Sequence, residues 1–236
     1  MLFHLKTMID IHSHYLHLVD DGSRSIEESL QMLSEAVSQG VSAVLLTPHY
    51  SEKFSLEQKV IEQRFEELKN AVKDANIPLE LYLGQELYLD KNFKSVIEKK
   101  EFFSLAKSKY ILVEFNSYND TDIADVVYEV RKLGYQVIVA HFERYDYATI
   151  RDAISVKEAG GYIQVNADAL FEKGYRAYKK KIKEYFNQGL VDFVASDIHP
   201  NRKNCMAKAY KWVKKKYGEE TANAVFKENA EKIIKG

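Results

Sequence analysis

Histidines and carboxylates follow short apolar runs at several places in this chain. His12 and His14 end the first run, 8–14, and stand two residues apart. On a strand this spacing sends both side chains to one face, where two imidazoles can bind one metal ion. Asp197 and His199 repeat the spacing at the end of the last run, 191–199. The residue types and their spacing therefore predict a metal centre at strand ends.

The intervening runs end in residues of the same types. Taken singly, each could be a cap or an ordinary polar residue, and Asp20-Asp21-Gly22 is also a typical turn sequence. Their recurrence at successive strand ends favours one shared site. The candidate nitrogen and oxygen ligands are His12, His14, Asp21, His49, Glu86, Glu114, His141, Asp197 and His199.

Nine candidate ligands exceed the needs of one ion, so we expect two or three ions in one pocket, bridged by Glu86 and by a water. Imidazole and carboxylate ligands without thiolate suit Mn²⁺, Fe²⁺, Co²⁺ or Zn²⁺ rather than a soft metal or an iron–sulfur cluster. Three divalent ions against the carboxylates of Asp21, Glu86, Glu114 and Asp197 would leave about two positive charges. A site of this charge is suited to a dianion such as a phosphate monoester.

The elements that must position these residues follow an alternating pattern. Seven runs, each too short for a helix and rich in β-branched residues, are typical of buried parallel strands; they lie at 8–14, 43–49, 79–86, 110–116, 136–144, 162–166 and 191–199. Helical patterns separate them, at about 25–40, 56–75, 93–100, 123–133, 150–159, 175–188, 206–217 and 219–234. In the first of these, Ser25 and Glu28 form a capping box and Gly40 ends the helix.

This alternation predicts an α/β fold, and barrels of this class place their chemistry at the carboxyl ends of the strands. We expect a distorted seven-stranded (β/α)7 TIM-like barrel in a single domain over residues 1–236, with 1–7 as a short N-terminal extension. An open doubly wound sheet would give a similar pattern.

The composition excludes several classes of protein. The net charge of the 236 residues is −1, which provides no global basic field for nucleic acid or a membrane surface. We expect the lysine-rich stretches at 179–183 and 214–216 to be solvated helix faces rather than an anion-docking patch. Cys205 is the only cysteine, which excludes an intramolecular disulfide and a thiolate-rich zinc site. With no signal peptide and no run of transmembrane length, we expect a cytoplasmic protein.

The motifs, taken in order, resemble those of the polymerase-and-histidinol-phosphatase (PHP) superfamily. The matching blocks are IDIHSHYLHLVDDGS, LLTPHY, LGQELY, LVEFN, VIVAHFERY, QVNADAL and ASDIH. They are most similar to the manganese-dependent tyrosine-protein phosphatase branch, which is linked to capsule and exopolysaccharide synthesis in Gram-positive bacteria. The resemblance covers nearly the whole chain and keeps the order and spacing of the motifs.

The resemblance implies a distorted seven-stranded barrel with a trinuclear metal site held by the nine candidate ligands. It also implies that the substrate is the phosphotyrosine tail of a cognate bacterial tyrosine kinase. Arg144 in HFERY would be the phosphate clamp, and Arg202 is the candidate for a second phosphate-binding arginine in a loop that looks shortened. The segment 15–18 (YLHL) departs from the family's small or Gly/Pro turn, so the pocket rim is expected to be reshaped. We expect His4 and His17 not to be ligands.

The mechanism expected from these residues is in-line attack on phosphorus by a metal-bridging hydroxide. Arg144 would bind the equatorial oxygens, and Asp197, His199 or a metal-bound water could protonate the leaving tyrosinate. We also expect Tyr50 or Tyr145, which adjoin the motifs, to stack on the substrate ring.

The sequence excludes one rival function and leaves two others open. Lys211 stands six residues after Cys205, where a cysteine-based tyrosine phosphatase would need an arginine, so that class is excluded. Two alternatives stay open. One is a small-molecule phosphomonoesterase of the histidinol-phosphatase type, and the other is a catalytically silent, metal-bound module that binds a kinase tail.

Overall fold

A computed structural model of the chain describes residues 7–171 and 176–236. The expected N-terminal extension, apart from Thr7, and His4 lie outside the described residues, as does the start of the helix expected at 175–188. None of the helices within the described ranges combines the length and the apolar character that a membrane span requires.

The described strands pair only in parallel and form two hydrogen-bonded ladders. One ladder has the order β1-β2-β4, and the other has the order β3-β5-β6-β7-β8-β9. The strands are β1 (Met8–Asp10), β2 (Val41–Leu46), β3 (His49–Tyr50), β4 (Glu80–Leu83), β5 (Glu86–Tyr88), β6 (Tyr110–Glu114), β7 (Gln136–Val139), β8 (Tyr162–Asn166) and β9 (Phe193–Ala195).

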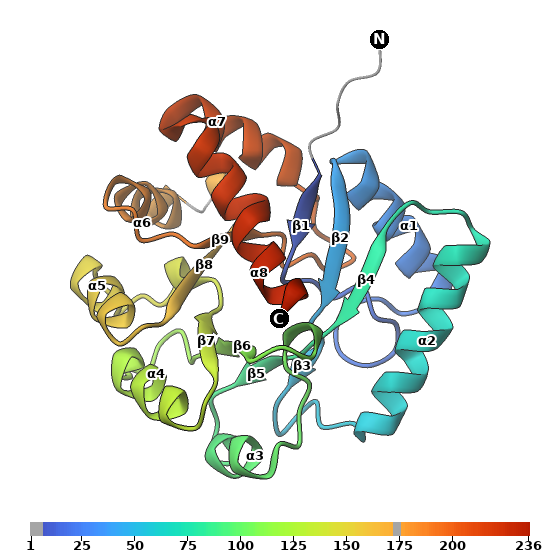
Figure 1. Ribbon diagram of the computed structural model, residues 1–236, viewed down its shortest axis with the longest axis horizontal. Helices are drawn as coiled ribbons and strands as arrows, with labels where there is room; N and C mark the ends of the chain where they lie inside the picture. Colours follow the sequence, from blue (N-terminus) through green and yellow to red (C-terminus); the bar gives the residue numbers. More distant parts are fainter. Residues whose placement is uncertain (1–6, 172–175) are drawn as a thin grey trace.

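Helices follow the strands and surround them in Figure 1, while the C-terminal helix lies across the centre of that view. The α-helices are α1 (Ile26–Ser38), α2 (Gln58–Asp74), α3 (Phe93–Lys99), α4 (Ile123–Lys132), α5 (Ile150–Glu158), α6 (Arg176–Asn187), α7 (Met206–Asn223) and α8 (Asn229–Lys235). Short 3₁₀ turns lie at η1 (Leu105–Lys107), η2 (Phe142–Arg144) and η3 (Asp168–Leu170), and the π-helical segment η4 (Ala224–Glu228) joins α7 to α8.

Local sequence signals explain several of these boundaries. The Ser25 hydroxyl accepts a hydrogen bond from the Glu28 amide at 3.2 Å, which caps α1 as predicted; the Glu28 carboxylate reaches back to the amide of Arg24 instead of that of Ser25. The boundary expected between the helices at 206–217 and 219–234 is confirmed. Gly218 lies within α7, but its φ of 93° and ψ of 165° are not helical, and this φ is readily adopted only by glycine.

The strands curl around an inner apolar core. Alternate residues of β1, β2, β6, β7 and β9 point inward, and α8 packs against them; the members of this core include Ile9, Ala43, Leu45, Leu112, Ile138, Ala195, Ala230 and Ile233. A second, larger core lies between the strands and the surrounding helices. An open doubly wound sheet would have helices on both faces, whereas here the inner face is covered by the curled strands and by α8.

The seven expected strand positions are present, with the second and third each divided in two. Pro48 separates β2 from β3, and Gly84 with Gln85 separates β4 from β5. A side chain at Gly84 would stand 2.6 Å from Leu105 Cδ2, so glycine allows η1 to pack closely there. Between the β1 and β9 regions, the pairing is a single bridge, Ser13 with Ile198. The α/β fold with a curled parallel sheet is thus confirmed, while the described strands form two ladders instead of one closed ladder.

Candidate metal centre and active site

Glu86 lies at the centre of the site, at the start of β5. It is completely buried, and its Oε2 lies 3.2 Å from His12 Nε2, 3.5 Å from His14 Nε2 and 2.9 Å from His49 Nδ1. Its Oε1 lies 3.0 Å from His141 Nε2. One carboxylate therefore faces four imidazoles that come from three strand ends, because His12 and His14 both follow β1.

The remaining candidates extend this cluster in two directions. Asp21 Oδ1 lies 3.4 Å from both His49 Nε2 and His199 Nε2, and Glu114 Oε1 lies 3.4 Å from His141 Nε2. The structure groups donor atoms within 4.8 Å of one another in three overlapping sets: His14, Asp21, His49 and His199; His12, His14 and Glu86; His49, Glu86 and Glu114.

Asp197, which follows β9, completes the cluster. Its Oδ1 lies 3.6 Å from His12 Nε2 and 3.4 Å from His14 Nε2. The structure thus brings all nine sequence-predicted ligand candidates together, and the overlap of the sets at His14, His49 and Glu86 leaves room for more than one ion.

The donors fit a divalent metal. Among the described residues, no group makes a well-aligned hydrogen bond to the buried Glu86 Oε2, despite the nearby imidazoles, or to the buried His141 Nδ1. Leaving a buried carboxylate oxygen without a hydrogen bond costs free energy, and a coordinated cation would supply the missing partner. The mixture of imidazole and carboxylate donors is the set that Mn²⁺, Fe²⁺, Co²⁺ and Zn²⁺ accept.

The electrostatics of the cluster also favour bound cations. Burial and the neighbouring charge of Glu86 raise the pKa of Glu114 to about 7. Although burial acts in the opposite direction, the adjacent imidazoles of His12 and His49 hold the pKa of Glu86 well below its usual range. Two carboxylates that compete for the same positive charge are stabilised when additional cations enter the pocket.

Backbone geometry at two candidate ligands is strained. His141 has a φ of 29° and Asp197 a φ of 46°, in the region that non-glycine residues rarely occupy. The Asp197 amide donates to the His12 carbonyl at 2.9 Å, and the His141 amide donates to Gln164 Oε1 at 2.8 Å. These bonds hold both residues in conformations that aim their side chains into the site.

Three supporting residues were not predicted as part of the site. Asp20 Oδ2 lies 2.7 Å from His14 Nδ1 and accepts the His49 amide at 3.0 Å. Gln164 Oε1 lies 3.1 Å from His12 Nδ1, and Asn166 donates to Asp197 Oδ2 at 2.8 Å. Two polar residues at alternate positions of the otherwise apolar strand β8 were the signal that could have identified Gln164 and Asn166.

The turn at 20–22, after the paired histidines, is tight. The Gly22 amide donates to Asp20 Oδ1 at 2.9 Å, and a side chain at Gly22 would stand 2.2 Å from the His14 carbonyl oxygen. Only glycine fits at this point. The Asp-Gly turn expected from the sequence therefore serves the site directly, because it places Asp20 behind His14 and Asp21 in front of His49.

Both sequence-predicted arginines meet at Asp197. Arg144 Nη2 lies 2.7 Å from Asp197 Oδ2, and Arg202 Nη1 lies 2.9 Å from the same oxygen and 3.0 Å from the Asp197 carbonyl. The Arg144 and Arg202 side chains keep 20% and 32% of their surface exposed, so their remaining donors face the opening of the site. The shortened loop after β9 therefore still brings Arg202 to the cluster.

The expectation that Tyr145 stacks on a substrate ring is wrong. Tyr145 is completely buried, its hydroxyl donates to the Ala140 carbonyl at 2.8 Å, and it accepts the Phe115 amide at 3.1 Å. Its ring packs edge-on against Phe115 and Phe142. Proximity in sequence to the HFER motif misled the prediction, because the side chain turns into the outer core.

Tyr50 does not line the cluster either. It follows His49 on β3, and successive strand residues point to opposite faces. Tyr50 instead lines a separate depression with Ser55, Asn92 and Lys99, in which no candidate ligand takes part. The expected stacking role of Tyr50 is therefore not supported by its position.

Phe54 and Tyr88 are the aromatic residues beside the cluster. They line a depression of about 390 Å³ together with His49 and Glu114. The Phe54 ring stacks on His49 with centroids 5.7 Å apart and planes at 18°. A larger depression of about 590 Å³ lies between α2 and β4, but no candidate ligand lines it.

The position of Phe54 is held by its own backbone. The amides and carbonyls of Ser51 and Phe54 exchange hydrogen bonds at 3.0 and 3.1 Å, which closes a tight turn. Phe54 is an apolar residue within the polar segment 51–57, and this was the sequence signal for its role.

This chain is similar to known proteins over nearly its whole length. The family model described as capsular polysaccharide synthesis, CpsB/CapC, matches residues 8–235. Tyrosine-protein phosphatase CpsB of Streptococcus agalactiae serotype V is 34% identical over 97% of this chain and 98% of its own length. Tyrosine-protein phosphatase YwqE of Bacillus subtilis is 30% identical over 97% of this chain and 92% of its own length.

Solved structures agree with these relatives. A crystal structure from work on YwqE of Bacillus subtilis and CpsB of Streptococcus pneumoniae, described as unique metal-dependent tyrosine phosphatases, superposes with a TM-score of 0.85. It shares 28% identity and covers 97% of this chain and 94% of that one. The phosphotriesterase homology protein of Escherichia coli superposes with a TM-score of 0.62 at 11% identity over 98% of this chain and 100% of that one, which shows a common fold alone.

Proposed function

This chain belongs to the CpsB/CapC family of capsular polysaccharide synthesis, and we propose that it is a metal-dependent tyrosine-protein phosphatase. The observation that carries the proposal is the position of Asp197. It joins the cluster of candidate metal ligands through Oδ1 and two guanidinium groups through Oδ2. A cation-binding pocket thus lies directly beside two anion-binding side chains, as phosphate-ester hydrolysis requires.

The nine candidate ligands would hold two or three ions. Mn²⁺ is the metal we assign, and Fe²⁺, Co²⁺, Zn²⁺ and Mg²⁺ are the alternatives that the donor set accepts. When bound, such ions stabilise charge on phosphoryl oxygens and lower the pKa of a coordinated water.

The chain's own residues position the phosphate. Arg144 and Arg202 present fixed, planar donors that match the oxygens of a phosphate dianion. Asp197 holds both guanidinium groups at the opening, which reduces the reorganisation needed when substrate arrives. Tyrosinate is a comparatively good leaving group, because the conjugate phenol has a pKa of about 10. Asp197 and His199 are our candidates for proton transfer to the leaving oxygen.

The tyrosyl ring of the substrate is assigned to the depression beside His49 and Glu114. Phe54 and Tyr88 would contact it there, in place of the tyrosines expected from the sequence. Aromatic pairs of this kind contribute about 0.5–1.5 kcal/mol beyond the area they bury, and a phosphoserine side chain would not gain this contribution.

The remaining parts of the proposal follow from the family. We infer that the strands form a distorted seven-stranded (β/α)7 barrel within a single domain over residues 1–236. The protein partner would be the phosphotyrosine tail of a bacterial tyrosine kinase that regulates capsule or exopolysaccharide synthesis, and the location would be the cytoplasm.

Phosphate release by metal-stripped protein, resupplied with Mn²⁺, tests this function. The substrates are a phosphotyrosine peptide, the matching phosphoserine peptide and histidinol phosphate. We expect Mn²⁺-dependent release from phosphotyrosine only. Preference for histidinol phosphate would move the assignment to a small-molecule phosphomonoesterase. Peptide binding without release from any substrate would instead identify a silent binding module.

A further inference from the structure

Positive charge is concentrated on two neighbouring helices. The α6 helix carries five basic side chains and one acidic one, and α7 carries five basic and two acidic ones. Their net charges are therefore +4 and +3, whereas the whole chain has a net charge of −1. Such an asymmetry creates a strong local field on one side of a nearly neutral protein.

The amino-terminal turns of these helices lie at the opening of the candidate active site. The α7 helix begins at Met206, four residues after Arg202, and the Met206 amide donates to Asn204 Oδ1 at 3.0 Å. The α6 helix packs against η2 and η3, which follow the carboxyl ends of β7 and β8. Lys181 of α6 donates to the Tyr145 carbonyl at 2.6 Å, next to Arg144.

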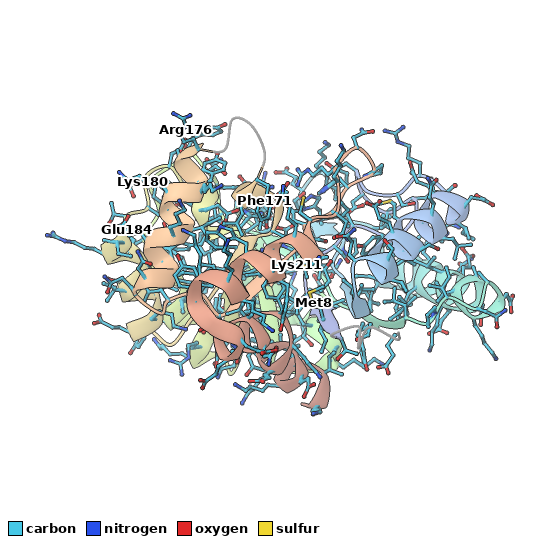
Figure 2. All side chains as sticks on the ribbon, turned by 90° about the horizontal axis from the view of Figure 1, so that it is seen from above. Met8, Phe171, Arg176, Lys180, Glu184 and Lys211 are labelled. Atoms are coloured by element: carbon cyan, nitrogen blue, oxygen red, sulfur yellow. The ribbon has the colours of Figure 1, made fainter. Side chains whose placement is uncertain are left out.

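The ring of Phe171, directly after η3, lies close to lysines of both helices. Lys208 Nζ lies 4.2 Å from the centre of its ring and Lys179 Nζ lies 5.9 Å from it. Figure 2 shows Phe171 between α6, with Arg176 and Lys180, and α7, with Lys211. We call the exposed basic residues at this opening the cationic face: Arg176, Lys180, Lys203, Lys208 and Lys211.

The cationic face is not neutralised from within the described part of the chain. There, its five side chains have no carboxylate within ion-pair distance; the nearby Lys214 pairs instead with Glu219, at 3.0 Å. Cations without such a partner beside a binding site attract a negatively charged ligand without first having to break an internal ion pair.

The opposite side of the opening is acidic. Asp90, Asp120 and Asp122 lie on the segments that follow β5 and β6, whereas Glu52, after β3, pairs with Lys91 at 2.9 Å. A flat anionic surface such as a membrane would meet both sides at once and would be repelled by the acidic one. A flexible peptide that enters the pocket can follow the cationic side alone.

We propose that the cationic face binds an acidic peptide segment continuous with the target phosphotyrosine, a proposal that rests on the proposed function. An extended peptide advances about 3.3 Å per residue, and Met206 to Lys211 covers about 7–8 Å of helix, so two or three flanking residues span this part of α7. Substrate selection then depends on acidic neighbours of the phosphotyrosine. Of the lysine-rich stretches at 179–183 and 214–216, which were expected to be solvated helix faces, only Lys180 takes part in this proposal.

The test compares two charge-reversal variants of equal composition. The opening variant is Lys180→Glu, Lys208→Glu, Lys211→Glu, and the control is Lys183→Glu, Lys215→Glu, Lys216→Glu, farther along the same two helices. The substrates are p-nitrophenyl phosphate, a phosphotyrosine peptide with Gly and Ser flanks, and the same peptide with Glu flanks. None of the substituted lysines belongs to the ligand cluster or to the phosphate-binding pair.

For the wild type we expect a KM for the Glu-flanked peptide about tenfold below that for the neutral peptide, since a few exposed charge pairs together contribute this much. The opening variant should lose this preference and the control should keep it. The kcat for p-nitrophenyl phosphate should stay unchanged in both variants, which also shows that both are folded. Raising the salt from about 0.05 to about 0.5 M should reduce the preference, because exposed charges are screened.

Equal KM values for the two peptides in the wild type would overturn the proposal, as would an equal loss of preference in both variants. Binding of the wild type to anionic vesicles that is lost in the opening variant, with an unchanged peptide KM, would assign the face to a membrane instead. Failure of the proposed function is a distinct outcome, because the wild type would then hydrolyse neither phosphotyrosine peptide. A triple variant with Gln at 180, 208 and 211 should show a smaller loss in the same direction.

Discussion

Replacing Asp20 with asparagine tests whether the residues behind the ligands control metal binding. The Asp20 side chain is completely buried, and its three contacts are His14 Nδ1 at 2.7 Å, the His49 amide at 3.0 Å and the Gly22 amide at 2.9 Å. Asparagine has nearly the same shape. The substitution therefore removes the negative charge behind His14 while leaving an oxygen for one of the two amides.

The expected loss of metal affinity follows from the kind of hydrogen bond that is removed. A hydrogen bond between a carboxylate and a ligating imidazole fixes the ring orientation and raises its basicity, and removing it weakens metal affinity by about 10–100-fold. That range corresponds to about 1.4–2.8 kcal/mol. Since Asp20 is buried behind His14, we expect the kcat at saturating Mn²⁺ to fall by no more than about twofold.

Calorimetric titration of metal-stripped protein with Mn²⁺ measures this effect, alongside the Mn²⁺ concentration that gives half-maximal phosphate release. The matched control is Asp74→Asn, at the exposed end of α2, which should bind Mn²⁺ like the wild type. If Asp20→Asn binds Mn²⁺ with wild-type affinity, or if its kcat collapses at saturating metal, the reasoning from this hydrogen bond is refuted.

Three further predictions concern neighbouring residues. Tyr145→Phe leaves the buried Phe115 amide and Ala140 carbonyl without a partner, at a cost of about 2 kcal/mol, so Tm should fall by about 4–8 °C. Its KM for aryl phosphates should not change, and an increased KM at wild-type Tm would restore the stacking role. Arg144→Lys keeps the charge but loses the planar pair of donors, and steady-state assays should show kcat/KM reduced about 100-fold. Activity within twofold of wild type would exclude Arg144 from the phosphate site. Chelation should abolish phosphate release, and Mn²⁺ at about 100 times its Kd should raise Tm by about 5–10 °C, since it binds only the folded state. A Tm independent of Mn²⁺ would show that the cluster does not bind the ion.

The main elements of the fold were predictable because their signals are local. Ser25 and Glu28 mark the start of α1, and the β-branched runs mark the strands. The division of the third strand at Gly84 was not predictable, because it depends on the close approach of Leu105, 21 residues later in the chain. The break at Gly218, by contrast, was predictable, because glycine adopts a φ of 93° without strain and interrupts the helical pattern there.

The candidate site was predictable because residues of the same types recur at the ends of successive apolar runs. His12, Glu86 and Asp197 each follow an apolar run, and parallel strands bring their carboxyl ends to one edge. The substrate-contacting aromatics were not predictable in this way. Tyr145 adjoins a motif but faces the outer core, whereas Phe54 lies in an unremarkable polar loop and faces the pocket.

By itself, the sequence determined the chemical types of the donors, the strands that carry them and the end of the sheet at which they meet, because strand period and helix caps depend on near neighbours. Only the tertiary structure decided that Asp20 and not Asp21 stands behind His14, that both arginines converge on Asp197, and that Lys208 and Lys179 share Phe171 at the opening. The physical reason is that these contacts join residues on separate strands, helices and loops. Their distances depend on how elements twist and pack against one another, and no short stretch of sequence contains that information.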